Sequence, residues 1–125
     1  MILLDTNFLI GALVPDTAFN RRTRQWLSGG EPVGFSTIAW AEFLCGPLSV
    51  DDAAAAAELL PNPEPLLPAD AARAAELFNV TGRRRGSLAD CLIAATCLRL
   101  GARLATENAD DFRRFEPMGL RLAAE

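Results

Sequence analysis

Short apolar segments alternate with longer helical stretches along the whole chain, and this alternation limits the folds that the chain can adopt. Brief apolar runs of this kind are typical of buried strands. We expect strands at Ile2–Leu4, Val33–Phe35, Leu66–Leu67, Arg103–Ala105 and Leu120–Leu122. Strands that alternate with helices are joined by right-handed crossovers, and they form a mostly parallel sheet with helices on both faces. The sequence therefore predicts an α/β fold.

Capping and turn residues mark the ends of the expected helices. We expect helices at Phe8–Val14 and Thr17–Ser28, from a cap at Ser36 or Thr37 through Cys45, between Ser49 and Leu60, at Ala69–Val80, and between Ser87 and Gly101. Ser36 or Thr37 caps the third of these, and Gly29–Gly30 offers the second a left-handed end. Ser49 and Ser87 each precede an aspartate by three residues, which is the spacing of a capping box. No linker or repeat interrupts the pattern, so the 125 residues are expected to form one domain.

The composition excludes several classes of catalyst. The chain contains no histidine, and all twelve of its basic residues are arginine. Ser-His and Cys-His catalysis, histidine zinc sites, lysine Schiff bases and the P-loop lysine are therefore excluded. The three cysteines are an odd number without C-x-x-C spacing, so we expect no disulfide framework and a reducing, cytoplasmic compartment. The N-terminal apolar run carries Asp5 and lacks a basic flank, so we expect neither a signal peptide nor a membrane anchor.

The arginines are clustered although the chain as a whole is acidic. The net charge is −4, which argues against nucleic-acid binding by bulk charge. Arginines nevertheless gather at Arg21–Arg24, Arg83–Arg85 and Arg113–Arg114. These clusters are either local positive patches or solvated helix ends and loops.

Acidic residues stand at four unusual places in this pattern. Asp5 directly follows the first expected strand, and Asp90 lies among apolar residues at the start of the last long helix. Glu42 has apolar residues on every side of its helix, so we expect that helix to be buried. Thr106–Phe112 forms an acidic loop after a strand.

Each acidic position also has a purely structural explanation. Asp5 can cap the helix that follows it, and Asp90 can complete the Ser87 cap. Glu42 can pair with an arginine, and the acidic loop can be a solvated helix start.

Taken together, the acidic positions predict an ion-binding site. The carboxyl ends of parallel strands meet at one edge of a sheet, and this edge is where α/β proteins bind ligands. Carboxylates that gather there repel one another unless a cation neutralises them. All-oxygen donors favour hard ions such as Mg²⁺ or Mn²⁺, which typically serve phosphoryl chemistry.

The same segments resemble a known family. Ile2–Asn7, Ala41–Glu42, Ser87–Ala95 and Thr106–Phe112 resemble, in this order, the motifs of PIN-domain nucleases, and most closely those of the VapC toxins of type II toxin–antitoxin pairs. The resemblance implies a single PIN-like domain over residues 1–125 and a cytoplasmic, divalent-metal-dependent endoribonuclease that uses Mg²⁺ or Mn²⁺. It also implies a homodimer and inhibition by a VapB-type antitoxin.

The resemblance assigns roles to particular residues. Asp5 and Asp90 would hold the ion, and Glu42 and Asp111 would complete the catalytic carboxylates. Four neighbours would bind substrate or support the site: Thr6, Asn7, Thr106 and Asn108.

The fourth acidic position is open. Part of the family has an acid two residues after the threonine, where this chain has Asn108, and part has an acid just before the phenylalanine, which here is Asp111. We expect Asp111 to take this role and Asp110 to face solvent.

Other functions remain open beside this one. Asn108 in place of an acid allows a non-catalytic PIN-like module that binds nucleic acid or a protein partner, and a PIN nuclease of RNA processing is a further alternative. Haloacid-dehalogenase-like phosphatases need an aspartate where this chain has Asn7 and also need a lysine, so they are disfavoured. Phe19 and Trp26 either form an antitoxin groove or pack in the core.

Overall fold

The sheet has four strands, all parallel. The computed structural model describes residues 1–46, 50–60 and 62–123. The strands are β1 (Ile2–Leu4), β2 (Val33–Phe35), β3 (Arg103–Ala105) and β4 (Arg121–Leu122). They lie in the order β2-β1-β3-β4, and each neighbouring pair is parallel. The predicted α/β fold with a parallel sheet is therefore confirmed.

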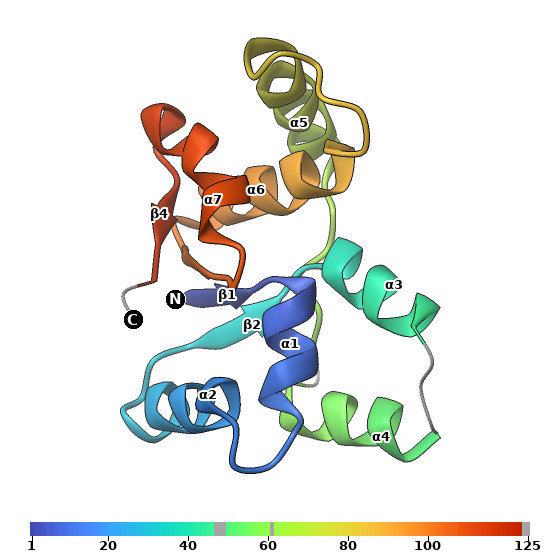
Figure 1. The fold of residues 1–125 in the computed structure, drawn as a ribbon, viewed down its shortest axis with the longest axis vertical. Coiled ribbons are helices and arrows are strands. Elements are labelled where there is room, and N and C mark those ends of the chain that lie inside the picture. The colour runs from blue at the N-terminus through green and yellow to red at the C-terminus, as the bar shows by residue number, and fades with distance from the viewer. Residues whose placement is uncertain (47–49, 61, 124–125) are drawn as a thin grey trace.

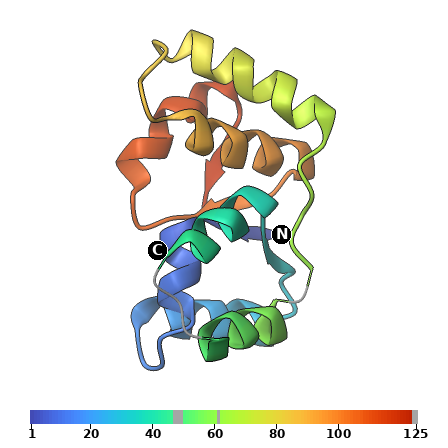
Figure 2. The ribbon, with the colours of Figure 1, turned by 90° about the vertical axis from the view of Figure 1, so that its right-hand side faces the viewer.

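Helices cover both faces of this sheet. They are α1 (Thr6–Ala12), α2 (Ala18–Ser28), α3 (Thr37–Cys45), α4 (Val50–Leu59), α5 (Pro68–Val80), α6 (Leu88–Leu100), α7 (Ala109–Phe112) and the 3₁₀ helix η1 (Arg113–Met118). Helices α5 and α6 lie on one side of the sheet, and α1, α2 and α4 lie on the other (Figures 1 and 2). None of the helices in the described ranges is long and apolar enough to cross a membrane.

The apolar runs of the sequence form the core. All three residues of β1 are completely buried, as a central strand covered on both faces requires. Phe8, Phe35, Phe43 and Phe115 are the largest of the fully buried side chains around this strand. The three cysteines are free thiols, and Cys91 and Cys97 belong to this core.

The strand expected at Leu66–Leu67 does not form. Only Glu64 pairs with the sheet edge, through an isolated bridge to Ser36. Pro65 and Pro68 flank the two leucines and have no N–H to donate, so the ladder cannot continue. The prediction was wrong because it weighed the apolar pair above the prolines beside it.

Helix ends and caps also differ from the expectation, and α1 ends at Ala12 rather than Val14. Helix α1 begins at Thr6 rather than Phe8, because the Asp5 carboxylate accepts a hydrogen bond from the Phe8 N–H and caps the helix there. The predicted capping box at Ser87 is absent, since the Ser87 hydroxyl donates to the Arg84 carbonyl and caps no amide of α6. The other proposed box begins at Ser49, which lies outside the described residues.

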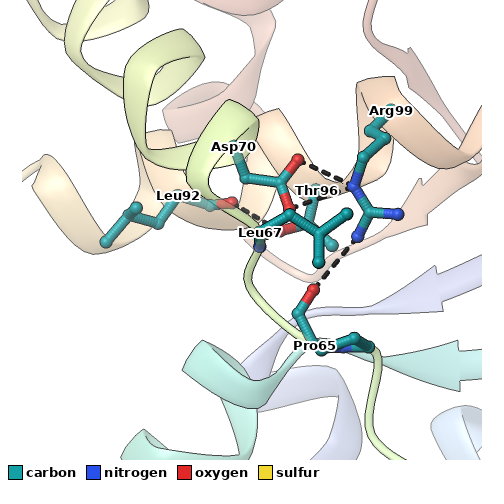
Figure 3. A network of polar contacts seen from close by, with 6 residues as sticks. All are labelled: Pro65, Leu67, Asp70, Leu92, Thr96 and Arg99. Atoms are coloured by element: carbon teal, nitrogen blue, oxygen red, sulfur yellow. Dashed lines mark hydrogen bonds and ion pairs between the residues drawn. The ribbon is translucent and has the colours of Figure 1, made fainter.

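An ion pair fixes α5 against α6 (Figure 3). Asp70 of α5 is 1% exposed, and its carboxylate accepts from the Arg99 Nε at 2.8 and 3.0 Å. The same carboxylate accepts from the Leu67 N–H at 2.9 Å, and the Arg99 Nη2 donates to the Pro65 carbonyl at 3.0 Å. The pair therefore joins both helices and the chain that enters α5.

Candidate active site

The sheet order locates a ligand-binding crevice between β1 and β3. The chain passes from β1 to β2 on one side and later returns to β3 on the other, so the strand order reverses beside β1. Leu4 pairs with Ala105 in register, and the Asp5 N–H donates to the Ala105 carbonyl at 3.0 Å. Asp5 and Thr106 therefore leave the sheet side by side, at the point where open α/β sheets bind ligands.

A pocket of about 120 Å³ opens at this point. Its lining contains seven of the eight residues that the sequence singled out, together with Ile93 and Phe112: Asp5, Thr6, Asn7, Glu42, Asp90, Asn108 and Asp111. The eighth residue, Thr106, lies behind this lining and hydrogen-bonds to Asp5. Asp110 lies away from the pocket, where it is 91% exposed and paired with Arg113. The structure thus gathers the predicted residues, while their chemical roles stay predictions.

Asp5 is the most deeply buried carboxylate of the pocket. Its side chain is 4% exposed, and Oδ1 accepts from the Phe8 N–H at 2.8 Å. Burial raises the pKa of Asp5 to about 6, and the hydrogen bonds from Thr106 and Phe8 offset part of that rise. Asp5 therefore caps α1 and also lines the pocket, so its structural role does not exclude the predicted functional one.

Glu42 reaches the pocket from a helix that is not buried. The expectation of an all-round buried helix was wrong, since Glu42 is exposed and Leu44 is 48% exposed. Helix α3 buries only Ala39 and Phe43, so one stripe of it meets the core. The Glu42 carboxylate accepts from the Thr6 hydroxyl at 2.7 Å, which ties α3 to the start of α1.

Asp90 lies on the first turn of α6, and its side chain is 34% exposed. Partial burial raises its pKa, the nearby Arg114 lowers it, and the carboxylates of Asp111 and Glu42 raise it further. For Asp5 and Asp90 alike, burial outweighs the repulsion between carboxylates as the cause of the shift. Protonated forms thus persist here to a higher pH than at the surface.

The oxygen atoms that line the pocket fit as ligands of a hard divalent ion that keeps part of its water shell. They are carboxylate, hydroxyl and amide oxygens, the ligand types that Mg²⁺ and Mn²⁺ prefer. Within the described ranges, no three acidic or thiol side chains converge into a ready-made metal cluster. Mg²⁺ needs no such cluster, because it commonly binds through one or two carboxylates plus water and substrate phosphate.

Ile93 and Phe112 form the apolar wall of the pocket, and the sequence analysis did not single them out. A signal for Ile93 existed, because it lies three residues after Asp90 and so shares a face of α6. Phe112 is buried directly after Asp111 and anchors α7 in the core.

Phe19 and Trp26 are partly buried and pack against the core. Their rings lie 5.0 and 5.7 Å from the Phe8 ring, measured between centroids. Core packing, one of the two explanations left open by the sequence, accounts for these aromatics.

Comparisons with known proteins agree with this fold. The model of the PIN domain family matches residues 2–116. VapBC2 from Rickettsia felis, solved with a promoter DNA fragment, superposes with a TM-score of 0.73 at 20% identity, covering 98% of each chain. FitAcB from Neisseria gonorrhoeae gives a TM-score of 0.71 at 25% identity, covering 99% of this chain and 97% of that one. A toxin–antitoxin complex from Klebsiella pneumoniae gives 0.66 at 25% identity, covering 90% and 91%. A search of curated protein sequences gave no match.

Proposed function

This chain belongs to the PIN-domain family, and from that premise we propose that it is a divalent-metal-dependent endoribonuclease, the toxin of a VapBC-type toxin–antitoxin pair. One observation carries the proposal. Asp5, Glu42, Asp90 and Asp111 come from four separate segments and line one pocket at the carboxyl edge of the sheet. Carboxylates that share a pocket repel one another, and a cation relieves that repulsion. A bound divalent ion therefore gives the four positions a common explanation.

The residues of the pocket suit hydrolysis of an RNA phosphodiester by water. A bound Mg²⁺ or Mn²⁺ supplies two things here, a lower pKa for the attacking water and compensation for the negative charge that develops on the phosphate. Asp5 and Asp90 would hold the ion, one from the N-cap of α1 and the other from the first turn of α6. Attack by water in line with the leaving 3′-oxygen leaves 5′-phosphate and 3′-hydroxyl ends, and it needs no RNA 2′-hydroxyl.

Glu42 and Asp111 would act at the open side of the pocket. Glu42 is exposed, and its hydrogen bond from Thr6 holds one carboxylate oxygen and leaves the other free to orient water. Asp111 is exposed on α7, where the neighbouring Asn108 supplies a neutral amide in place of an acid. Asn7 and Asn108 offer amide donors to substrate oxygens at this rim.

The similarity to toxin–antitoxin complexes supports the proposal of an antitoxin partner, and the homodimer is proposed from the resemblance to the VapC family. An antitoxin segment with arginine or lysine would suit an acidic pocket on an acidic chain. We propose that such a segment blocks the pocket, and that the protein works in the cytoplasm.

A second candidate function is a PIN-like module that binds RNA or a partner without cutting. Asn108 favours it, since an amide stands in the pocket where part of the family has an acid. Both candidates share the fold and the pocket, so only a measurement of cleavage separates them.

Cleavage of a mixed RNA pool by the purified chain, freed of any antitoxin, tests the proposal. Reactions would contain Mg²⁺, Mn²⁺ or EDTA, with Asp5→Asn and Asp90→Asn as inactive variants and Asp110→Asn as the matched control. We expect metal-dependent cuts with 5′-phosphate ends that only the two pocket variants lose. Cutting that survives EDTA would contradict the proposed chemistry. Absence of cutting by folded protein, with RNA still bound, would favour the non-catalytic module.

A further inference from the structure

We call the pocket that Asp5, Glu42, Asp90 and Asp111 line the carboxylate pocket. A second pocket, of about 140 Å³, lies beside it and shares Asp90 and Asp111 with it. The rest of its lining is basic or small: Arg84, Arg85, Gly86, Ser87 and Arg114. We propose that this pocket, named here the arginine pocket, binds a backbone phosphate of the RNA next to the one that is cleaved, with Arg114 as its main ligand. The inference rests on the proposed function and adds to it a subsite for the substrate.

Arg114 carries the argument, because two of its three guanidinium nitrogens are buried and lack hydrogen-bond partners, although its side chain also lies at the Cys91 thiol. The side chain is 15% exposed and lies over the Phe115 ring, with 4.6 Å from the guanidinium carbon to the ring centroid. Its Nε and Nη2 atoms are buried without a hydrogen-bond partner. The Asp90 carboxylate is 3.7 Å from Nη2, too far for a hydrogen bond. Buried donors are nearly always satisfied, so an arginine that lines the pocket and has two unsatisfied donors points to a ligand that accepts from its guanidinium.

The start of α6 borders the same pocket, where Ser87 and Asp90 belong to the lining. Ser87 precedes this 13-residue helix but caps none of its amides, because the hydroxyl donates to the Arg84 carbonyl. The first amides of a helix have no partner within the helix, and they carry partial positive charge. Gly86, with φ at +79° and open space where a Cβ would stand, lets an anion approach the backbone closely.

The charges of the arginine pocket favour an anion along its outer side. Three arginines face two carboxylates there, and Arg84 and Arg85 are exposed at the rim. Asp90 and Asp111 mark the boundary with the carboxylate pocket. A phosphodiester chain has an anion at every nucleotide, so it can place one phosphate at each of two adjoining sites.

The structure separates the arginines within each run of the sequence. Arg83 pairs with Asn79 and lies over the Phe78 ring, and Arg113 pairs with Asp110 at 2.6 Å. Neither lines the arginine pocket. Arg113 and Arg83 therefore serve as matched controls for Arg114 and Arg85, with the same change of charge one or two residues away.

Binding of a short single-stranded RNA of mixed sequence, measured by fluorescence anisotropy in EDTA at several salt concentrations, tests the subsite. For Arg114→Gln we expect an affinity about tenfold lower than that of the unmodified chain. The slope of log affinity against log salt should fall by about 0.7, which is the loss of one phosphate contact on a single strand. Arg113→Gln and Arg83→Gln should stay within about twofold.

Further variants separate ligand binding from folding. Arg85→Gln changes an exposed side chain, so it should keep the melting temperature and still weaken RNA binding. Arg114→Lys keeps the charge but loses the planar fork, so it should recover only part of the affinity. Thermal melts identify any variant that fails to fold.

The outcomes distinguish the subsite from the proposed function. Equal affinity and equal salt slope for Arg114→Gln, Arg85→Gln and Arg113→Gln would overturn the subsite and leave the nuclease proposal standing. Failure of the folded, unmodified chain to bind RNA at all would contradict the proposed substrate, and the subsite with it.

Discussion

Helix α6 has an aspartate–arginine pair near each end, and the two pairs are built in different ways. Near the C-terminal end, Asp70 and Arg99 are joined by hydrogen bonds at 2.8 and 3.0 Å (Figure 3). The Asp70 carboxylate also accepts from the Leu67 N–H, and the Arg99 guanidinium also donates to the Pro65 carbonyl. Near the N-terminal end, Asp90 and Arg114 are 3.7 Å apart, and two guanidinium nitrogens have no hydrogen-bond partner.

The difference separates a group that holds the fold from one that is available to a ligand. A buried pair with satisfied donors and acceptors fixes geometry, and its loss leaves an uncompensated charge. A pair whose arginine has buried, unsatisfied donors is retained at some cost in stability, which is typical of functional sites. Helix α6 thus has the Asp70–Arg99 pair, which joins it to α5, at one end and the candidate active site at the other.

The largest expected effect comes from Asp90→Asn, in the pair near the N-terminal end of α6. Cleavage should fall about 1,000-fold, because a ligand of the ion is lost at the reacting phosphate. The free energy of unfolding should stay equal or rise, since burial already raises the pKa of Asp90 and disfavours its charged form. Initial rates and urea denaturation would be measured on the same preparation. A large loss of stability would show that Asp90 is structural.

Arg99→Met, in the pair near the C-terminal end of α6, should lower stability and leave activity unchanged. It leaves the Asp70 carboxylate, 1% exposed, without its cation, so the free energy of unfolding should fall by about 3 kcal/mol. Cleavage per folded molecule should be unchanged. Urea denaturation checks the first expectation, and rates corrected for the folded fraction check the second. A change below about 1 kcal/mol would mean that the Asp70–Arg99 pair contributes little to the stability of the fold.

Asp5→Asn should change how stability depends on pH. The pKa of Asp5 in the folded chain, about 6, lies above its ordinary value of 3.8. The folded state therefore holds a proton that the unfolded chain has lost, so the free energy of unfolding falls as pH rises from about 4 to 6.

Asparagine keeps the cap on α1 but cannot ionise. At neutral pH the variant should be more stable than the unmodified chain by up to about 3 kcal/mol, with no difference below about pH 4. Thermal melts across this range provide the measurement. Parallel pH profiles for the two proteins would show that Asp5 does not titrate in this window.

The smallest effect is expected for Arg114→Met, the counterpart of Arg99→Met. The free energy of unfolding should change by less than about 1 kcal/mol, because lost contacts with Phe115 and Asp90 are offset by removal of two unsatisfied buried nitrogens. The same urea titrations serve for both methionine variants. A loss equal to that of Arg99→Met would remove the distinction between the two ends of α6.

Local pattern was enough to predict the fold and the gathering of the acids. Apolar runs located β1 to β4, and the rule that parallel strands end at one edge placed Asp5 near Asp90 and Asp111. These conclusions needed only the order of the elements. The strand expected at Leu66–Leu67 failed for an equally local reason, the prolines on both sides.

Long-range pairings and the exposure of particular side chains could not be predicted in this way. Asp70 and Arg99 are 29 residues apart, and in sequence Asp70 is an ordinary acid in the first turn of an alanine-rich helix. The apolar residues around Glu42 suggested burial, but α3 meets the core on one stripe only. Which of two adjacent arginines, Arg113 or Arg114, faces a pocket depends on how η1 packs.

The central claim is that Asp5 and Asp90 hold a divalent ion in the pocket at the carboxyl edge of the sheet, and Mn²⁺ binding measured by electron paramagnetic resonance tests it most directly. The unmodified chain and Asp110→Asn should bind Mn²⁺ alike, because Asp110 lies outside the pocket. Asp5→Asn and Asp90→Asn should bind at least about tenfold more weakly. Equal binding by all four proteins would place the ion elsewhere and contradict the account.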